Sequence, residues 1–312
     1  MKIEDYKKVN DAFQKKLIFN LGSEAGFFSE FNNMILSMIF CLNNEIQFVL
    51  YSKNANFGFK NGWDDYFKPF CYETKGFLNK YLNRRRNYFI SVESKLINKI
   101  FNNAAYIYKK LHGIDYLTFD LFDKIRQNNN KIIELKPFGI SGNLQELCKI
   151  IIEMIWQFND STNSEIKSLM RNIELPEDYI SIHIRGGDKF IDTPLINFDE
   201  YMKIVSEKSK IRNVFILTDD YRYFENLTMN YPNWNFFTLT YQDERGYFHK
   251  KFMGKSKEDR KRYILKLLAS IEIISNSKLF IGTFSSNIGM YMGMRMPSDK
   301  IISIDLPEWQ IW

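Results

Sequence analysis

The stretch Tyr179-Ile-Ser-Ile-His-Ile-Arg-Gly-Gly-Asp-Lys189 decides the fold of this chain. Its first half is short, apolar and rich in β-branched residues, which predicts a buried strand. Its second half is a charged turn with two glycines, so the strand's last side chains are expected at the edge of a sheet, where ligands bind in open α/β folds. We expect Arg185 to bind a phosphate or diphosphate there, because its planar guanidinium can donate two parallel hydrogen bonds. A surface ion pair with a nearby acid is the plainer alternative.

The pattern after this stretch predicts a parallel, Rossmann-like α/β domain. Further strands are expected at 213–217, 235–239, 278–282 and 300–304, separated by helices that end at Lys208, Asn230, Asn276 and Arg295. Asn197 and Ser256 are the expected N-caps of two of these helices. We assign residues 177–312 to this domain.

The N-terminal half also begins as an α/β unit. A strand at 16–21, a glycine turn, a helix at 27–42 and a strand at 46–51 form a predicted βαβ unit. Residues 75–131 are irregular in pattern, and helices are expected at 143–158 and 164–173, after a polar break at 159–163. We assign residues 1–176 to an α/β and helical domain that binds the acceptor.

Composition limits the classes of protein that remain. The chain has 312 residues, 45% hydrophobic content and a net charge of +6, which fits an anionic ligand, a membrane surface or nucleic acid. Its three cysteines (Cys41, Cys71 and Cys148) lack paired spacing, so we expect a reducing compartment and neither disulfide nor zinc. The first residues lack the apolar core of a signal peptide, and the apolar run at 34–42 is too short to span a bilayer. We expect a soluble protein, at most peripheral to a membrane.

Polar residues follow three of the predicted strands, and parallel strands bring such ends to one edge. They are His183, Arg185, Asp188 and Lys189 after the first, Thr218, Asp219 and Asp220 after the second, and Thr283, Ser285, Ser286 and Asn287 after the third. Hydroxyls and backbone N–H groups at a helix start form an anion seat, which Arg185 would complete into a diphosphate clamp without metal. The plainer alternatives are a core histidine at 183 and helix caps at 219 and 220. The acidic pair could also hold a divalent ion, but that signal is weak.

Two N-terminal segments are further candidates. The turn from Gly22 to Gly26 offers N–H groups at a helix start, and Gly22 is included among the expected donor-binding residues, although glycine here could simply permit the turn. Trp63, Asp64 and Asp65 combine an aromatic ring with carboxylates, a pattern found on carbohydrate-binding surfaces and equally in loop anchors. The basic run at 84–86 is most simply a solvated face, with nucleic acid or anionic lipid as alternatives.

Four motifs in order resemble the α-1,6-fucosyltransferase family, which includes animal N-glycan core enzymes and the rhizobial nodulation enzyme. His183-Ile-Arg-Gly-Gly-Asp-Lys189 is similar to the family's HxRRxDK motif, and Thr218-Asp-Asp220 to its TDD. Thr283-Phe-Ser-Ser-Asn287 is similar to its TFSSQ, and the segment at 62–69 to its GW-x-x-x-F-x-P. This sequence departs from the pattern in having Gly186 for the second arginine, Ser270 where the family has an acid, and Asn287 for glutamine.

The resemblance implies a GT-B-like fold with two Rossmann-like domains and an inverting glycosyltransferase that uses GDP-β-L-fucose without metal or other cofactor. Carried across by position, Arg185 would stabilise the departing diphosphate, His183 would contact the nucleotide, and Ser286 and Asn287 would hold phosphate. Asp188 and Lys189 would lie at the reacting centre. Asp192 is the nearest candidate for the base that deprotonates the acceptor hydroxyl.

We therefore predict a bacterial-type, cytoplasmic fucosyltransferase acting on an oligosaccharide or glycolipid, with no nucleic-acid partner. One alternative is transfer from another GDP-sugar. A second is a metal-dependent phosphoesterase built on Asp188, Asp219 and Asp220. A third is a non-catalytic protein that binds glycans or nucleic acid through its basic run and surface aromatics.

Overall fold

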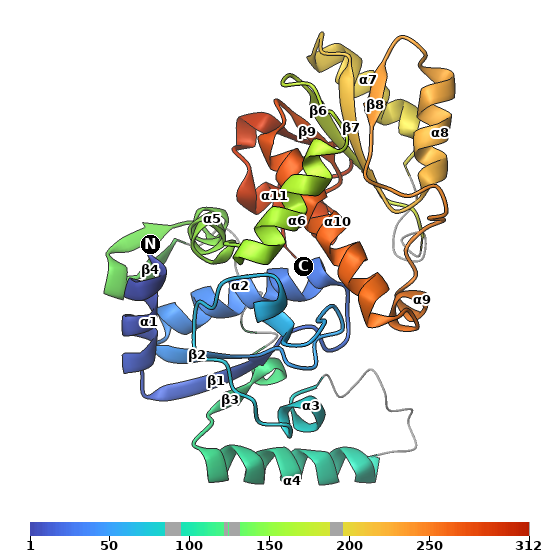
Figure 1. The fold of residues 1–312 in the computed structure, drawn as a ribbon. Helices are drawn as coiled ribbons and strands as arrows, with labels where there is room; N and C mark the ends of the chain where they lie inside the picture. Colours follow the sequence, from blue (N-terminus) through green and yellow to red (C-terminus); the bar gives the residue numbers. More distant parts are fainter. Residues whose placement is uncertain (85–94, 122–123, 125–131, 188–195, 312) are drawn as a thin grey trace. The chain divides into compact units, whose positions relative to one another are not determined.

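The structure is a computed structural model that describes residues 1–84, 95–121, 124, 132–187 and 196–311 (Figure 1). The chain divides into two compact units, Met1–Asn159 with Ile311, and Asp160–Gln310. The division lies upstream of the predicted boundary at 176/177. The reason is that helix α6 (Asp160–Arg171) packs on helix α10 (Lys257–Asn276) of the second unit.

The first unit contains a parallel three-stranded sheet in the order β2-β1-β3. Its strands are β1 (Lys15–Asn20), β2 (Ile46–Tyr51) and β3 (Tyr116–Leu117), and helix α2 (Phe27–Asn43) connects the first two. The predicted βαβ unit is confirmed. Helix α2 is apolar on almost every face because it also packs on α5 (Leu144–Ile155) and contacts both β1 and β2. Helix α1 (Ile3–Ala12) covers β2.

The rest of the first unit differs from the sequence pattern in two places. The segment expected to be irregular contains α3 (Asn79–Leu82), α4 (Lys95–His112), β3 and the short η4 (Thr118–Asp120). Helix α5 ends earlier than predicted, because Phe158 pairs with Phe67 in an antiparallel bridge. Helix α6, the first element of the second unit, in turn begins earlier than predicted, within the polar run. The remaining elements are η1 (Gly62–Asp65), β4 (Ile133–Leu135), η5 (Lys136–Phe138) and β5 (Ile140–Gly142), with β4 and β5 antiparallel.

The second unit is the predicted parallel domain. Its five-stranded sheet has the order β10-β9-β6-β7-β8, with β6 (Ile180–Ile184), β7 (Asn213–Thr218), β8 (Asn235–Phe237), β9 (Phe280–Gly282) and β10 (Ile301–Ser303), all parallel. The chain runs outward from β6 to β8 and then crosses back to β9. The pair β6–β9 is therefore the point where the strand order reverses, which is where open α/β sheets bind ligands.

Four helices contact strands of this sheet: α7 (Phe198–Lys208), α8 (Tyr221–Asn230), α10 and α11 (Asn287–Arg295) (Figure 1). The unit also contains α9 (His249–Met253) and the short η7 (Ser298–Lys300). Two predicted N-caps are confirmed, since Asn197 Oδ1 accepts from Asp199 N at 3.2 Å and Ser256 Oγ from Asp259 N at 3.0 Å. No helix in the described ranges combines the length and apolarity needed to cross a bilayer.

Candidate functional site

Arg185 lies directly after β6, at the reversal point of the sheet. Its Nη1 donates to Asp219 Oδ2 in an ion pair, and its guanidinium carbon lies 5.2 Å from the centroid of the Tyr247 ring. About a quarter of the side chain (23%) is exposed. A guanidinium has five N–H donors in a fixed planar arrangement, so the pairing with Asp219 fixes the orientation of the group.

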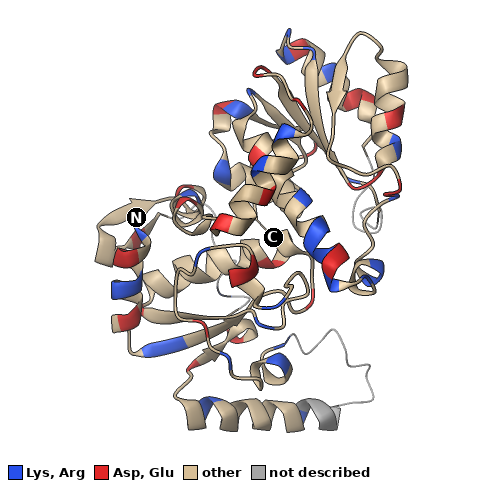
Figure 2. Ribbon diagram, in the orientation of Figure 1, with Lys and Arg blue, Asp and Glu red and all other residues tan. Residues whose placement is uncertain are grey.

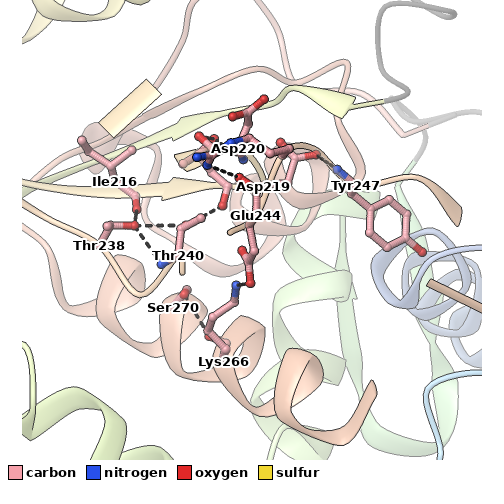
Figure 3. Close-up of polar contacts among 11 residues, drawn as sticks. Ile216, Asp219, Asp220, Thr238, Thr240, Glu244, Tyr247, Lys266 and Ser270 are labelled. Atoms are coloured by element: carbon pink, nitrogen blue, oxygen red, sulfur yellow. Dashed lines mark hydrogen bonds and ion pairs between the residues drawn. The ribbon is translucent and has the colours of Figure 1, made fainter. Parts of the chain in front are cut away.

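Asp219 connects three separate segments of the second unit. Its Oδ1 accepts from Gly186 N at 2.7 Å, and its Oδ2 accepts from Arg185. The same Oδ2 accepts from Tyr247 N at 2.9 Å (Figure 3). Its backbone oxygen accepts from Gly246 N at 2.8 Å. The carboxylate therefore fixes the turn after β6 and the loop before α9 against the end of β7.

Asp220 has a different role from its neighbour. Its Oδ1 accepts from Arg222 N at 3.0 Å, which caps α8, and the carboxylate forms an ion pair with the Arg222 side chain. Burial alone would raise the pKa of Asp220, but the hydrogen bonds and charge of Arg222 outweigh it and lower that pKa. This geometry matches the plainer alternative for Asp220, a helix cap.

A buried ion pair holds the loop that carries Tyr247. Lys266, on α10 and 5% exposed, pairs with Glu244 (Figure 3). The ammonium also lies 4.9 Å from the Tyr241 ring centroid and 5.4 Å from that of Tyr263. Burial lowers the pKa of Lys266, and the nearby Glu244 opposes that shift. Sequence reasoning missed this pair because its members are distant in sequence and belong to no motif.

Two glycines allow this loop to approach the turn after β6. Gly187 has φ +56°, and a Cβ there would lie 2.3 Å from the Tyr247 carbonyl oxygen. Gly246 has φ +93°, and its Cβ would lie 2.7 Å from Gly187 Cα. At Gly186, where the family has its second arginine, a Cβ would lie 3.2 Å from Asp219 Oδ1 and from the Tyr223 ring. A side chain at position 186 would therefore require Asp219 or Tyr223 to shift by a few tenths of an ångström.

The turn after β9 lies next to Arg185 in the sheet, because β6 and β9 pair at Ile182 and Ile281. However, the expected anion seat is partly filled by the chain itself. Asp305 accepts from Phe284 N at 2.8 Å and from Ser285 N at 3.2 Å. Ser286 Oγ accepts from Gly289 N at 3.0 Å, so it caps α11.

The other residues of this turn are placed as follows. Thr283 is buried, and its carbonyl accepts from Ser286 Oγ at 2.8 Å. Asn287 is the exposed first residue of α11. Burial would raise the pKa of Asp305, but hydrogen bonds from Ser285, Ser303 and Phe284 outweigh it and lower that pKa. Sequence reasoning missed Asp305 because its partners lie about twenty residues away.

Of the other residues predicted from the first motif and the segment after it, the structure describes His183 alone. His183 lies within β6 and is 2% exposed, as the core alternative expects. Asp188, Lys189 and Asp192 fall outside the described residues. Ser270, at the place of the family's acid, is buried and donates to Lys266 O at 2.9 Å. Among the residues described, no group of three or more histidine, cysteine or acidic side chains has the spacing to hold a metal ion.

In the first unit, the turn that contains Gly22 is closed by Glu30. The carboxylate accepts from the backbone N–H groups of four successive residues, 22–25, at 2.9 Å for Ser23, 2.6 Å for Glu24 and 2.7 Å for Ala25, with Gly22 closer still. Burial raises the pKa of Glu30, and these hydrogen bonds oppose the shift. The backbone amides that were expected to bind a donor phosphate instead donate hydrogen bonds to the Glu30 carboxylate.

Two of the three predicted acceptor residues, Trp63 and Asp64, line the same cavity of about 380 Å³ at the end of β2, together with Glu73 and other residues. Asp64 is exposed, whereas Trp63 is 1% exposed and stacks on Phe67 with ring centroids 4.2 Å apart. Asp65 does not line the cavity and accepts from the backbone of residues 59–61, as a loop anchor does. Burial is the largest cause of a raised pKa at both Asp64 and Glu73.

A comparison with protein families finds one match. Residues 147–292 match the sequence model of the α-(1,6)-fucosyltransferase N- and catalytic domains. The match covers the motif turns after β6, β7 and β9, so the resemblance suspected from those motifs is confirmed over this part of the chain. No curated protein matches the sequence significantly.

Solved structures share the fold over almost the whole chain. Fucosyltransferase NodZ from Bradyrhizobium superposes with a TM-score of 0.56 at 12% identity, covering 94% of this chain and 96% of NodZ. NodZ soaked with GDP-fucose gives the same TM-score and coverage at 13% identity. A variant of Arabidopsis thaliana FUT1 in complex with GDP gives 0.51 at 13% identity, covering 98% of this chain and 75% of FUT1. The predicted GT-B-like fold is confirmed.

Proposed function

We propose that this chain, a glycosyltransferase whose residues 147–292 match the α-(1,6)-fucosyltransferase model, transfers L-fucose from GDP-β-L-fucose to a glycan hydroxyl. The reaction would proceed with inversion and without a metal ion. The observation that carries the proposal is Arg185, held by Asp219 and Tyr247 at the reversal point of the sheet with its side chain partly exposed.

In this reaction the acceptor oxygen attacks the anomeric carbon from the face opposite GDP. The carbon–oxygen bond to the β-phosphate breaks, and GDP leaves with the electron pair. Arg185 stabilises the negative charge that develops on the diphosphate, and Asn287 at the start of α11 binds phosphate from the neighbouring turn. The acceptor proton passes to a carboxylate, for which Asp192 remains the candidate. Asp188 and Lys189 are assigned to the same centre.

The acceptor is an oligosaccharide or glycolipid, and the cavity beside Asp64 and Glu73 supports a polar, sugar-sized ligand in the first unit. We place the enzyme in the cytoplasm, with peripheral contact to a membrane. The phosphoesterase alternative is weakened because Asp219 and Asp220 already accept hydrogen bonds from Arg185 and Arg222, which compete with metal ligation.

Nucleotide-dependent melting tests the donor. We expect GDP to raise the melting temperature clearly more than UDP or ADP, because only a ligand that binds the folded state stabilises it. Equal shifts with all three nucleotides would exclude a guanine-specific site. Transfer from GDP-fucose to a panel of glycans is then measured with and without EDTA. Loss of transfer with EDTA would overturn the metal-independent reaction.

A further inference from the structure

Helix α4 buries only part of its surface. Ala105 and Tyr108 are buried and pack in a cluster with Ile18, Val49 and Leu117 of the first unit's sheet. These contacts occupy one face of the helix. They account for α4 as a structural element, but they leave its other apolar residues without a role.

A second apolar stripe of α4 is exposed. Ile100, Ile107 and Leu111 are 59%, 55% and 76% exposed, respectively. Spacings of seven and four residues place them on one side of a helix, next to the buried face. Three large aliphatic side chains so aligned differ from the scattered single apolar residues of ordinary surfaces, which need no explanation.

The charge beside this stripe is of one sign. Lys99 and Lys110 are exposed, and Lys110 Nζ lies 5.8 Å from the ring centroid of Tyr106, which is 58% exposed. Residues 95–112 contain no aspartate or glutamate, and Figure 2 shows Lys and Arg but no Asp or Glu colouring along α4. Lys109 is engaged differently, since its Nζ pairs with Asp120 at 2.8 Å.

We propose that the exposed stripe of α4, with Lys99 and Lys110 beside it, docks the protein on an anionic lipid bilayer. A helix with an apolar face and a basic flank lies in the plane of the interface, with its apolar side chains below the headgroups. Lysines near the surface are attracted to anionic headgroups. Charge complementarity selects this partner, because the helix offers cations and no anion to whatever covers the stripe. The proposal does not depend on the donor or the reaction proposed above.

Vesicle binding tests this surface with the full chain. Cosedimentation is measured with vesicles of phosphatidylcholine mixed with phosphatidylglycerol, and with vesicles of phosphatidylcholine alone. The variants are Ile107→Glu with Leu111→Glu, and Lys99→Ala with Lys110→Ala. The matched control is Met229→Glu, which changes a 73% exposed residue on α8 of the other unit. Circular dichroism melting reports whether each variant folds.

We expect wild type and Met229→Glu to bind the mixed vesicles and to bind phosphatidylcholine much more weakly. The double glutamate variant should bind at least about tenfold more weakly, because two large aliphatic side chains no longer enter the apolar layer. The double alanine variant keeps the apolar stripe and therefore tests the charges, even if the first variant fails to fold. Its affinity for the mixed vesicles should fall about tenfold, and its binding should depend less on salt.

Three results would overturn the proposal. The first is equal binding of wild type to both kinds of vesicle or to neither. The second is unchanged binding of both double variants. The third is a change from dimer to monomer in the double glutamate variant, measured by light scattering, without a change in vesicle binding. That result would assign the stripe to a second copy of the chain.

Discussion

The turn after β1 and the turn after β6 are both anchored by a carboxylate, but the two carboxylates bind different groups. In each, a carboxylate collects backbone N–H groups of a glycine-containing turn that follows a parallel strand. Glu30 accepts from four amides of the first turn. Among the described residues, the Asp219 side chain accepts from the backbone amides of Gly186 and Tyr247 and from the guanidinium of Arg185. The carboxylate of Glu30 therefore holds backbone alone, whereas Asp219 also holds a partly exposed cation.

This difference shows that a strand followed by a glycine turn does not by itself identify a ligand site. What matters is which groups the anchoring carboxylate engages and whether any of them still reaches solvent. The two turns should therefore respond to substitution in opposite ways, one through activity and the other through stability.

The largest expected effect is on activity, from Arg185→Ala. We expect transfer to fall about a thousandfold, equivalent to about 4 kcal/mol, because one fixed positive group no longer stabilises the leaving diphosphate. The variant should remain folded, because Asp219 keeps its hydrogen bonds from the amides of Gly186 and Tyr247. The control is Arg222→Ala, which removes an exposed arginine paired with Asp220. Full turnover in Arg185→Ala would remove this residue from the mechanism and end the contrast between the two turns.

The second largest effect is expected from Lys266→Met, which should reduce both stability and GDP binding. Removing one partner of a buried ion pair leaves Glu244 without its cation, which should lower the free energy of unfolding by about 3 kcal/mol. It should also weaken GDP binding, since Glu244 holds the loop whose Tyr247 contacts Arg185 and Asp219. Denaturant unfolding and calorimetry measure the two quantities, with Lys278→Met at the exposed pair with Asp178 as the control. Unchanged GDP affinity would separate this loop from the site.

Glu30→Gln should affect stability alone. An amide would place N–H groups against some of the backbone N–H groups that the carboxylate now accepts, so we expect a loss of about 2 kcal/mol in the free energy of unfolding. GDP affinity should be unchanged, and the exposed Glu4→Gln serves as the control. A large loss of GDP affinity in folded Glu30→Gln would instead place the first turn at the donor site, as the sequence suggested.

The smallest effect concerns pH and Asp305. Its pKa is lowered in the folded state, so its contribution to stability is fully present above the unfolded value of about 3.9 and is lost as pH falls through the folded value. Wild type should therefore lose more stability than Asp305→Asn between about pH 5 and pH 2. Urea unfolding across this range measures the difference. Parallel curves for the two proteins would show that the amides of Phe284 and Ser285 do not depend on this charge.

Strands and helices could be predicted from the sequence where burial requires a regular pattern of apolar residues. The strand Ile180–Ile184 is continuously apolar except for Ser181 and His183, and its place in a parallel sheet was predicted from the alternation of strands and helices. Helix α4 was not predicted, because its apolar residues lie on both a buried and an exposed face and therefore do not show the usual amphipathic pattern. Arg185 was identified as a site candidate because a charge after a buried strand is local information.

The partners of that arginine were less accessible to sequence reasoning. Tyr247, Glu244 and Lys266 come from a polar loop and a helix face, where the same residue types are usually solvated. Asp305 and Glu30 were missed for a related reason. Their role is to accept backbone N–H groups, and a backbone donor leaves no trace in the residue types of a sequence.

The contact between Gly187 and Gly246 has a consequence for how variation in this enzyme would be interpreted. Each has left-handed backbone geometry and leaves no room for a Cβ against the other segment. In a saturation mutagenesis screen scored by activity, both codons would tolerate almost no replacement, although neither residue has a side chain to offer a substrate. Both positions would then score like catalytic residues, although the cause is steric: two backbone segments lie too close together to admit a Cβ atom.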